Sequence, residues 1–422
     1  MTAVRIRRQM TFLPDSARVI IRPFIPSDVK IVESVIGRAL ALSDAEAEHE
    51  LAIVSAEFDS RHFDIDSLLA AHFERVRQHV QNADGLSDTR RLLIGALFSG
   101  EYALESAALF NPSIVPHPDQ SGMPAGAMRY IMSLRATGEG HISSVEFRTG
   151  TITAEGKVSV EPVSPYVTVP EVFSGADCLY ELHFDAKLAM SERIIFPVAA
   201  SESNGIEDAR FVRFVEHDGT ATYYATYTAY NGRAITPQFI ETTDFMKFRM
   251  LSLTGEAVKN KGMALFPRRV NGRYAMLSRQ DDENLYIMFS DKLLHWDEKI
   301  LLRRPTLPWE LVKIGNCGSP IETPAGWLVI THGVGPMRKY CLGAILLDLE
   351  DPTRVIGYLA EPLLKPEGSE REGYVPNVVY SCGSLVHGRE LILVYAMSDI
   401  ASVISTLKLD DLLKAFTPNP AT

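Results

Sequence analysis

The first hundred residues carry apolar side chains at the spacing of amphipathic helices. Between residues 26 and 98 apolar positions recur every three or four residues, as Val29, Val32 and Ile36 do. The runs begin at residues suited to capping a helix. The predicted helical segments start after Pro26-Ser27-Asp28, at the capping box Ser43-Asp44-Ala45-Glu46, at Asp66 and after Ser87-Asp88-Thr89. They predict a small helical region at the start of the chain.

After about residue 108 the pattern changes to short β-rich runs separated by Gly, Pro, Asn and Asp. A weak repeat links Glu241–Phe248 to Met288–Trp296, each a strand followed by Ser or Thr, Asp and an aromatic residue. Short antiparallel strands repeated every roughly 40 to 60 residues are typical of propeller blades. The sequence therefore predicts a mainly β fold, a five-bladed β-propeller with an N-terminal α-helical region. The expected domains are a mostly helical extension at 1–107, the propeller at 108–408 and a C-terminal tail at 409–422.

Composition and charge narrow the class of protein. The chain has 422 residues, of which 46% are hydrophobic and 23% are charged, as in soluble globular proteins. Its net charge of −11 argues against nucleic acid or an anionic membrane as a partner. No apolar run approaches the ~20 residues of a membrane span, and the residues after Met1 do not form a signal region, so we expect a cytoplasmic protein.

Motifs for cofactors are missing from the sequence. The four cysteines have no CxxC spacing, which predicts neither a zinc site nor a disulfide framework. The chain also lacks HExxH, a P-loop and a GxGxxG motif. We therefore expect neither a metal nor a nucleotide cofactor.

Two adjacent carboxylates, Glu207 and Asp208, precede the expected strand Phe211–Phe214. Strand alternation predicts that one of them points inward and the other outward. The tyrosines and threonines of the next expected strand, Thr222–Tyr230, offer hydroxyls and flat rings that suit a sugar. The alternative is an exposed acidic turn, in which Arg210 forms a surface ion pair of roughly 0 to 1 kcal/mol.

These carboxylates belong to an ordered set of motifs. The set comprises Phe110–Ser113, Ser133–Ala136, Gly205–Arg210, Gly326–Val334, Leu346–Pro352, Val375–Tyr380 and Ala396–Asp399. In this order the motifs resemble glycoside hydrolase family 130, over residues 108 to about 405. The family consists of five-bladed propellers that act on β-mannosides, so the resemblance implies this fold and a β-mannoside oligosaccharide as substrate.

The resemblance implies that Asp208 is the general acid, with Ala209 in the place of the family's usual proline. It also implies inversion of configuration and transfer of the proton through the mannosyl 3-hydroxyl. Because an acid that works near neutral pH needs a raised pKa, we expect burial or Glu207 to raise the pKa of Asp208. The residues implied to bind substrate are Asn111, Arg135, Glu207, Arg210 and Asp399. Turns and ion pairs would also explain such residues without a substrate.

Several basic residues are candidates for the side of the site from which water or phosphate attacks. They are His141, Lys261, Arg279 and His332. Many phosphorylases of the family have a Ser-Arg pair where this chain has Gly140-His141, and the loss of a permanent cation slightly favours hydrolysis. Hydrolysis needs a carboxylate base, for which Glu139, Glu146 and Glu372 are candidates. A hydrogen-bonded core position is the alternative for His332, and a solvated face is the alternative for the cations.

The leading hypothesis is an inverting glycosidase that removes β-linked mannose, expected to be β-1,2-linked, from short mannosides. The first alternative is a β-mannoside phosphorylase that releases mannose 1-phosphate, with inorganic phosphate as co-substrate and no cofactor. The second is a non-catalytic propeller that binds oligosaccharides. A glycosidase for arabinosides or fructosides ranks last, because Phe110–Ser113 contains no acidic residue. The apolar faces of the N-terminal helices need cover, which predicts either a homo-oligomer formed through them or a wall that closes the pocket to all but short substrates.

Overall fold

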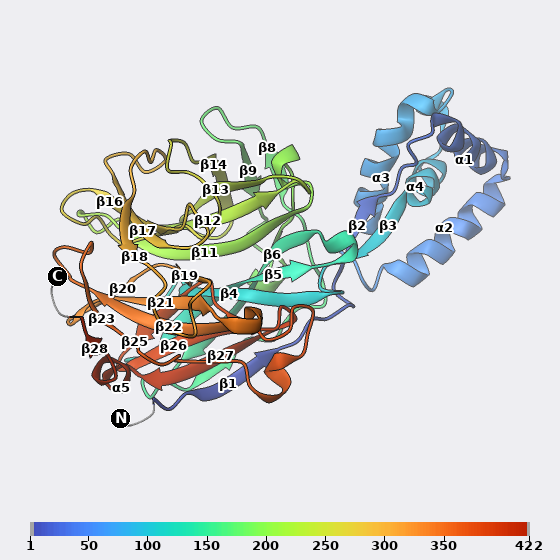
Figure 1. The fold of residues 1–422 in the computed structure, drawn as a ribbon. Helices are drawn as coiled ribbons and strands as arrows, with labels where there is room; N and C mark the ends of the chain where they lie inside the picture. The colour runs from blue at the N-terminus through green and yellow to red at the C-terminus, as the bar shows by residue number, and fades with distance from the viewer. Residues whose placement is uncertain (1–3, 420–422) are drawn as a thin grey trace. The chain divides into compact units, whose positions relative to one another are not determined.

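The computed structural model describes residues 4–419. The fold is mainly β, which confirms the predicted class, and the chain divides into two compact units (Figure 1). The helical unit contains Asp15–Leu104 and Ser164–Thr168. The β unit contains the segment before Asp15, Glu105–Val163 and the chain from Val169 onward.

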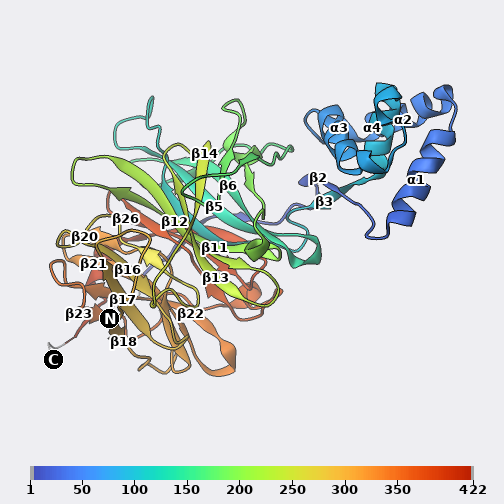
Figure 2. The same ribbon diagram turned by 90° about the horizontal axis from the view of Figure 1, so that it is seen from above.

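The helical unit contains the helices expected from the apolar spacing. They are α1 (Val29–Ala41), α2 (Asp44–Phe58), α3 (Ile65–Val76) and α4 (Asp88–Leu97). The short 3-10 turns η1 (Arg77–His79) and η2 (Ala83–Gly85) and the hairpin of β2 (Val19–Pro23) and β3 (Ser99–Ala103) complete it. Ser43 and Glu46 form the predicted capping box. Figure 2 shows α1, α3 and α4 of this unit from a second side. Val32, Ile36 and Phe73 lie in the shared core with Ile94 of α4.

The largest sheet of the β unit has eleven strands, in the order β4-β5-β6-β11-β12-β13-β14-β9-β8 with β7 and β10 beside β6. A single parallel pair, Gly205 with Ser143, joins β11 to β6, whereas the other neighbours in this sheet are antiparallel. The strands are β4 (Ala108–Pro116), β5 (Met128–Thr137), β6 (Ser143–Ile152), β7 (Val158–Val160), β8 (Glu171–Phe173), β9 (Tyr180–His183), β10 (Ile194–Ile195), β11 (Gly205–Val215), β12 (Ala221–Tyr230), β13 (Ile235–Thr242) and β14 (Lys247–Ser252). The sheet therefore consists of two antiparallel groups that meet at one point.

Three smaller sheets complete the β unit. The first contains β15 (Ala264–Leu265), β16 (Tyr274–Ser278), β17 (Leu285–Ser290) and β18 (Ile300–Arg303). The second contains β19 (Lys313–Asn316), β20 (Ile321–Thr323), β21 (Gly326–Val334), β22 (Tyr340–Leu347), β23 (Val355–Tyr358) and β28 (Thr417–Pro418). The third contains β1 (Arg7–Phe12), β24 (Val379–Tyr380), β25 (Ser384–His387), β26 (Glu390–Met397) and β27 (Ala401–Lys408). Short 3-10 turns also lie between strands of the β unit. They are η3 (Glu139–His141), η4 (Met190–Glu192) and η5 (Ala200–Glu202) in the largest sheet, and η6 (Pro336–Arg338) and η7 (Gly368–Arg371) in the smaller ones.

Segments at both ends of the described chain join the sheets of the β unit. β1 pairs with β27, and its Arg7 lies opposite Thr406. Helix α5 (Leu409–Lys414) buries Leu412 in the core, and β28 pairs with β23. The domain boundaries expected after residues 107 and 408 stay a prediction, although these contacts place the first strand and the last helix in the β unit.

Two of the four tyrosines of β12 serve the core and not a sugar. Tyr223 and Tyr227 are each 2% exposed and pack in the largest apolar cluster. The Tyr223 hydroxyl donates to the carbonyl of Pro116 at 2.8 Å, and the Tyr227 hydroxyl donates to Glu202 at 2.6 Å. Because both rings and hydroxyls are already engaged, the expected sugar platform on this strand is wrong for these two residues.

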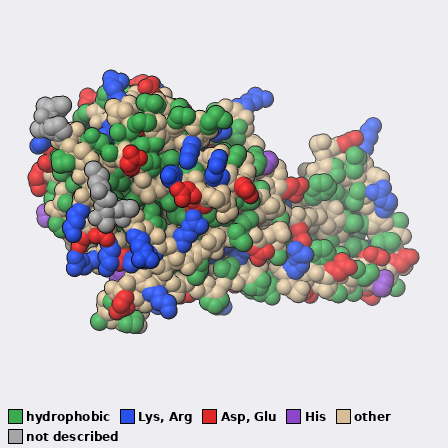
Figure 3. Space-filling view, turned by 60° about the horizontal axis from the view of Figure 1, so that its bottom comes forward, with side chains coloured by type: hydrophobic (Ala, Val, Ile, Leu, Met, Phe, Trp, Pro, Cys, Tyr) green, Lys and Arg blue, Asp and Glu red, His purple; other side chains and the backbone are tan. Residues whose placement is uncertain are grey.

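The surface offers no single area of one charge on the face shown in Figure 3, where basic and acidic side chains are intermixed. On the helical unit, large apolar side chains are also exposed, including Phe24 at 73% and Ile31 at 50%. None of the helices in residues 4–419 is both long and apolar enough to cross a bilayer.

Candidate active site

Three residues of the expected site stand where the backbone leaves regular strand geometry. Asn111, Asp208 and Asp399 have positive φ values of 48°, 54° and 53°. The register of β4 shifts between Phe110 and Ser113, and that of β11 shifts between Glu207 and Arg210. A β-bulge inserts an extra residue and turns its side chain out of the alternating pattern. These irregularities therefore aim polar side chains that a regular strand would direct elsewhere.

Asp208 accepts hydrogen bonds from residues of two neighbouring strands. The side-chain amide of Asn111 on β4 donates to it at 2.6 Å, and the guanidinium of Arg135 on β5 donates to it at 3.2 Å. The same guanidinium donates to Glu207 at 2.6 Å. The prediction that the two carboxylates point to opposite faces is therefore wrong, because the bulge lets both reach Arg135. The alternative of an exposed turn is also wrong, since Asp208 is 9% and Arg210 is 2% exposed.

A cavity of about 140 Å³ opens at Asp208. Six of the residues singled out in the sequence line it: Asn111, Arg135, Asp208, Lys261, Arg279 and Asp399. Arg338, Tyr340, Val375, Val378 and Tyr380 complete the wall. Among the described residues, four cations thus face two carboxylates, and the cavity has a surplus of positive charge.

The two carboxylates of the cavity have pKa values shifted in opposite directions. Burial alone would raise the pKa of Asp208, but the charges of Arg135, Lys261 and Arg210, with the Asn111 hydrogen bond, outweigh burial and lower it to about 2. Burial, followed by the charge of Asp208, raises the pKa of Asp399 to about 6. The expectation of a raised pKa at Asp208 is therefore wrong for the ligand-free cavity. The surrounding cations keep this carboxylate ionised.

Glu207 and Arg210 lie beside the cavity and do not line it. Glu207 pairs with Arg135 at 2.6 Å and with Lys261 at 3.9 Å. Arg210 donates to the hydroxyl of Tyr380 at 2.6 Å and to the carbonyl of Asn316 at 2.9 Å. Both residues hold the groups that line the cavity, and their expected contact with substrate stays a prediction.

His332 on β21 lies behind Arg279. One guanidinium nitrogen of Arg279 is 3.0 Å from Nε2 of His332, and the histidine is fully buried. Burial, together with the charges of Arg279 and Arg210, holds the pKa of His332 well below its usual value. A neutral imidazole accepts this hydrogen bond and orients the guanidinium. The role of His332 on the attacking side therefore stays a prediction, with Arg279 between it and the cavity wall.

His141 is exposed, and its ring lies 5.2 Å from that of Tyr374, outside the described cavity lining. The candidate bases are outside this lining as well. Glu146 is fully buried and pairs with Arg148 at 3.1 Å, so it is wrong as a base. Glu139 and Glu372 are exposed on turns. Asp399 is the carboxylate that shares the described lining with Asp208.

Sequence reasoning missed Arg338 and the two tyrosines Tyr340 and Tyr380 of the wall. Arg338 follows Met337, and the φ angles of both are positive: 58° for Met337 and 54° for Arg338. The Gly335-Pro336 pair, which only Met337 separates from Arg338, is typical of such a turn and could have drawn attention to it. Tyr380 is the last residue of the motif Val375–Tyr380, but the sequence did not indicate that its side chain would line the cavity.

The described residues contain no group of three or more His, Cys, Asp or Glu side chains placed to hold a metal ion. The four cysteines are free thiols, three of them buried. Cys317 lies 3.8 Å from the ring of His332, where it packs behind the cavity wall. The groups that line the cavity are carboxylates, an amide, tyrosines, cations and two valines.

Comparison with known proteins adds an independent finding. Residues 177–417 match the family Glyco_hydro_130, described as beta-1,4-mannooligosaccharide phosphorylase. The chain is 37% identical over 228 residues to 1,2-beta-oligomannan phosphorylase of Thermoanaerobacter sp. (strain X514), covering 52% of this chain and 75% of that protein. It is 29% identical over 228 residues to beta-1,2-mannobiose phosphorylase of Listeria innocua serovar 6a, covering 52% of this chain and 62% of that protein.

The fold is also similar to that of solved structures. The beta-1,2-mannobiose phosphorylase from Listeria innocua, in complex with beta-1,2-mannobiose, aligns with a TM-score of 0.52 and 19% identity. The alignment covers 73% of this chain and 92% of that structure. At this identity the likeness concerns the fold alone.

Proposed function

Because the chain belongs to glycoside hydrolase family 130, we propose that it is a phosphorylase that cleaves β-mannosides and releases mannose 1-phosphate. The observation that carries this proposal is the surplus of cations around Asp208: Arg135, Lys261, Arg279 and Arg338 line one small cavity. A phosphate ion needs such charge, whereas a water molecule does not. The relatives matched in sequence are named as phosphorylases, which also favours this alternative over the hydrolysis preferred from the sequence.

We assign the phosphate to Lys261, Arg279 and Arg338. A guanidinium can bind two phosphate oxygens at once, and an ammonium adds a mobile point charge. Arg279 is 4% exposed, and its contact with His332 fixes its orientation before phosphate arrives. The cation lost at Gly140-His141 is thus replaced in this proposal by Arg338, which comes from a different part of the chain.

Asp208 is the proposed general acid, and phosphate itself would prepare it. In the ligand-free cavity the positive field keeps Asp208 ionised. A phosphate ion beside Lys261 and Arg279 would cancel part of that field and raise the pKa of Asp208 toward a useful range. The buried position of Asp208 would then add to the rise. Acid strength and phosphate binding are therefore coupled in this proposal.

The proposed reaction inverts the anomeric carbon. A phosphate oxygen attacks C1 of the mannosyl unit from the face opposite the glycosidic oxygen, and the C1–O bond breaks. The leaving oxygen takes a proton that Asp208 supplies through the mannosyl 3-hydroxyl. Asn111, Arg135 and Asp399 hold the mannosyl hydroxyls in place. The products are mannose 1-phosphate and the shortened mannoside.

We propose a β-1,2 linkage, because two of the relatives reported above are named for β-1,2-linked substrates. The family description names a β-1,4-mannooligosaccharide, so the β-1,4 isomer is the competing substrate. The five-bladed propeller, an oligomer formed through the helical unit and a cytoplasmic location are proposals as well. The sheet order supports the first of these, since the eleven-stranded sheet divides into two antiparallel groups beside three smaller sheets.

The test is to incubate the protein with β-1,2-mannobiose, with and without phosphate, and to separate mannose from mannose 1-phosphate. Sugar phosphate formed only with phosphate supports the proposal. Free mannose formed equally in both samples would overturn it in favour of a β-mannosidase, with Asp399 as the carboxylate to examine as base. Binding without any product, for both β-1,2- and β-1,4-mannobiose, would favour a non-catalytic binding protein.

A further inference from the structure

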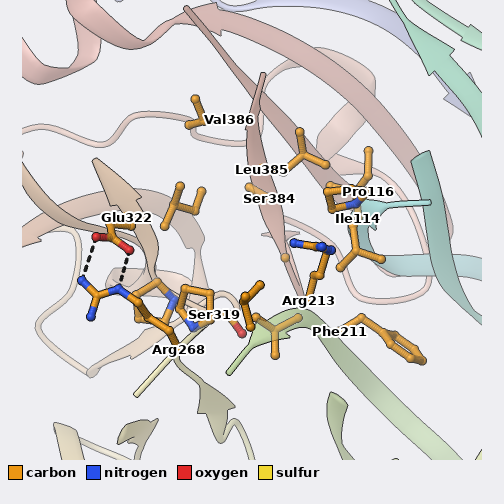
Figure 4. A pocket seen from close by; sticks show the side chains of 17 residues that line it. Ile114, Pro116, Phe211, Arg213, Arg268, Ser319, Glu322, Ser384, Leu385 and Val386 are labelled. Carbon is orange, nitrogen blue, oxygen red and sulfur yellow. Dashed lines mark hydrogen bonds and ion pairs between the residues drawn. The ribbon is translucent and has the colours of Figure 1, made fainter. Parts of the chain in front are cut away.

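A second cavity of the β unit lies farther along β4 and β11 (Figure 4). It has a volume of about 350 Å³, and β25 and the segments 267–268 and 319–322 complete its wall. On β11, Arg213 lines this cavity and Asp208 lines the first one, five residues earlier. Five residues of strand span about 15 Å. No residue lines both cavities in the described part of the chain, so this is a separate site.

The cavity contains one basic side chain whose charge is not neutralised by a carboxylate. Arg268 donates to both oxygens of Glu322, at 2.7 Å each, so these two charges cancel. Arg213 is exposed, and its side chain contacts that of Tyr223, whereas no acid of the described residues forms an ion pair with it. Figure 4 shows the Arg213 guanidinium among the lining side chains, away from the Arg268–Glu322 pair. A positive charge is therefore available to a ligand.

Two serine hydroxyls of the wall also lack a partner. The Oγ atoms of Ser319 and Ser384 are both buried, and neither forms a hydrogen bond within the protein. Leaving a buried hydroxyl unpaired is unfavourable, so such groups usually have a bound partner. Much of the remaining wall is apolar, and includes Ile114, Phe211 and Leu385. The cavity thus combines one cation and two hydroxyls with an apolar surface.

We propose that this cavity binds a phosphorylated monosaccharide. The phosphate would accept a hydrogen bond from the guanidinium of Arg213. The hydroxyls of Ser319 and Ser384 would donate to it after rotation of their side chains toward the cavity that both residues line. The apolar wall would cover the carbon-bound face of the sugar ring. A volume of about 350 Å³ is in the range of small-molecule sites, whereas inorganic phosphate would leave most of it unfilled. A neutral sugar would leave the charge of Arg213 unmatched.

This proposal does not depend on the proposed function, since the residues of the two cavities are different. The probe is mannose 1-phosphate, titrated by calorimetry into the wild-type protein and the Arg213→Ala variant. Arg233→Ala is the matched control, because Arg233 is also an exposed arginine but lines neither cavity. We expect the Arg213 variant to lose one binding event, or to weaken it at least ten-fold, and the Arg233 variant to keep it.

A second variant, Ser384→Leu, fills the cavity and should remove the same binding event. Circular dichroism and the melting temperature establish that both variants fold. Turnover of β-1,2-mannobiose should be the same in Arg213→Ala and in the wild type. If the proposed reaction is wrong, the wild type itself will not form mannose 1-phosphate, whereas the binding comparison between wild type and variant is unaffected. Identical isotherms for wild type and both folded variants would overturn the proposal. Arg213-dependent binding of inorganic phosphate as tight as that of the sugar phosphate would overturn the assignment of a sugar.

Discussion

The two cavities of the β unit share β4 and β11 but are built by different backbone geometry. At the Asp208 cavity both strands are bulged, and Asn111 and Asp208 have positive φ. Beyond it, β11 pairs with β12 in regular register from Arg210 to Val215, and the second cavity has a wall with many apolar side chains. The bulged part of β11 thus carries a charged site, and the regular part of the same strand lines a cavity with many apolar side chains. Changes at the bulges should affect chemistry, and changes beyond them should affect binding or stability.

The largest expected effect comes from Asp208→Asn. The amide keeps the hydrogen bond geometry approximately but cannot donate the acid proton, so turnover should fall about 10²–10⁴-fold. The control is Asp218→Asn, which changes an exposed carboxylate in the turn between β11 and β12. Steady-state kinetics of β-1,2-mannobiose cleavage, with a melting curve for each variant, make the comparison. Near wild-type turnover in a folded Asp208 variant would refute its role as the acid.

The next effect in size is expected from Arg279→Gln. Loss of the guanidinium removes a proposed phosphate contact worth about 1.5–3 kcal/mol, which corresponds to roughly 10- to 100-fold in kcat/KM for phosphate. Arg273→Gln is the control, because this arginine lies on the surface and pairs with Asp291. Initial rates at varied phosphate concentration measure the difference. If both variants show the same dependence on phosphate, Arg279 does not bind it.

A smaller effect, with opposite signs for activity and stability, is expected from Asp399→Asn. Because the pKa of Asp399 is raised to about 6, its ionised form destabilises the native state above that pH. The neutral variant should therefore be more stable at pH 7.5, by about 1–3 kcal/mol, and this gain should shrink as pH falls from 6 toward 4. Cleavage should weaken, since the amide accepts fewer hydrogen bonds from mannosyl hydroxyls.

Chemical denaturation at pH 7.5 and pH 4.5 tests the stability of this Asp399 variant, with the same two measurements on Asp410→Asn as a surface control. Asp410 is paired with Arg389 on the surface, and its pKa is lowered. It should therefore show no gain at pH 7.5. Equal changes in the two variants would contradict the proposed burial effect at Asp399.

The smallest effect is expected from Ala209→Pro, which restores the residue usual in the family. Asp208 and Ala209 together lie opposite Tyr227 alone, so Ala209 stands in the bulge and outside the regular ladder. Proline is tolerated at bulges, and we expect the melting temperature to change by only a few degrees and turnover to stay within about three-fold. Val212→Pro is the contrast, since Val212 pairs with Tyr224 in the regular ladder. A folded Val212 variant would weaken this distinction.

Much of the fold could be predicted from sequence because its signals are local. The capping box at Ser43 and Glu46 and the apolar spacing after Asp28 identify helices that form as expected. The start of β11 was less predictable, since it begins at Gly205 and the sequence suggested Phe211. A bulge breaks the two-residue alternation on which strand prediction depends, so the bulged part of the strand was not recognised.

The site could be predicted as a list of residues but not as an arrangement of charges. The family resemblance brought Asn111, Asp208 and Asp399 to attention, and the structure places all three on one cavity. The direction of the Asp208 pKa shift was wrong because it depends on cations from other strands, including Lys261. Such contacts join residues far apart in the chain, and one sequence alone gives no distances between them.

The pairing of β1 with β27 has a consequence for the order in which the chain can fold. Arg7 and Thr406 lie opposite each other in one sheet, although nearly the whole chain separates them. During synthesis β1 leaves the ribosome long before its partner strand, because nearly four hundred residues lie between Arg7 and Thr406. The helical unit, most of which is encoded between Asp15 and Leu104, can form in the interval. β1 must therefore wait for β27 before it can pair, and this long-range closure should be a slow step of folding.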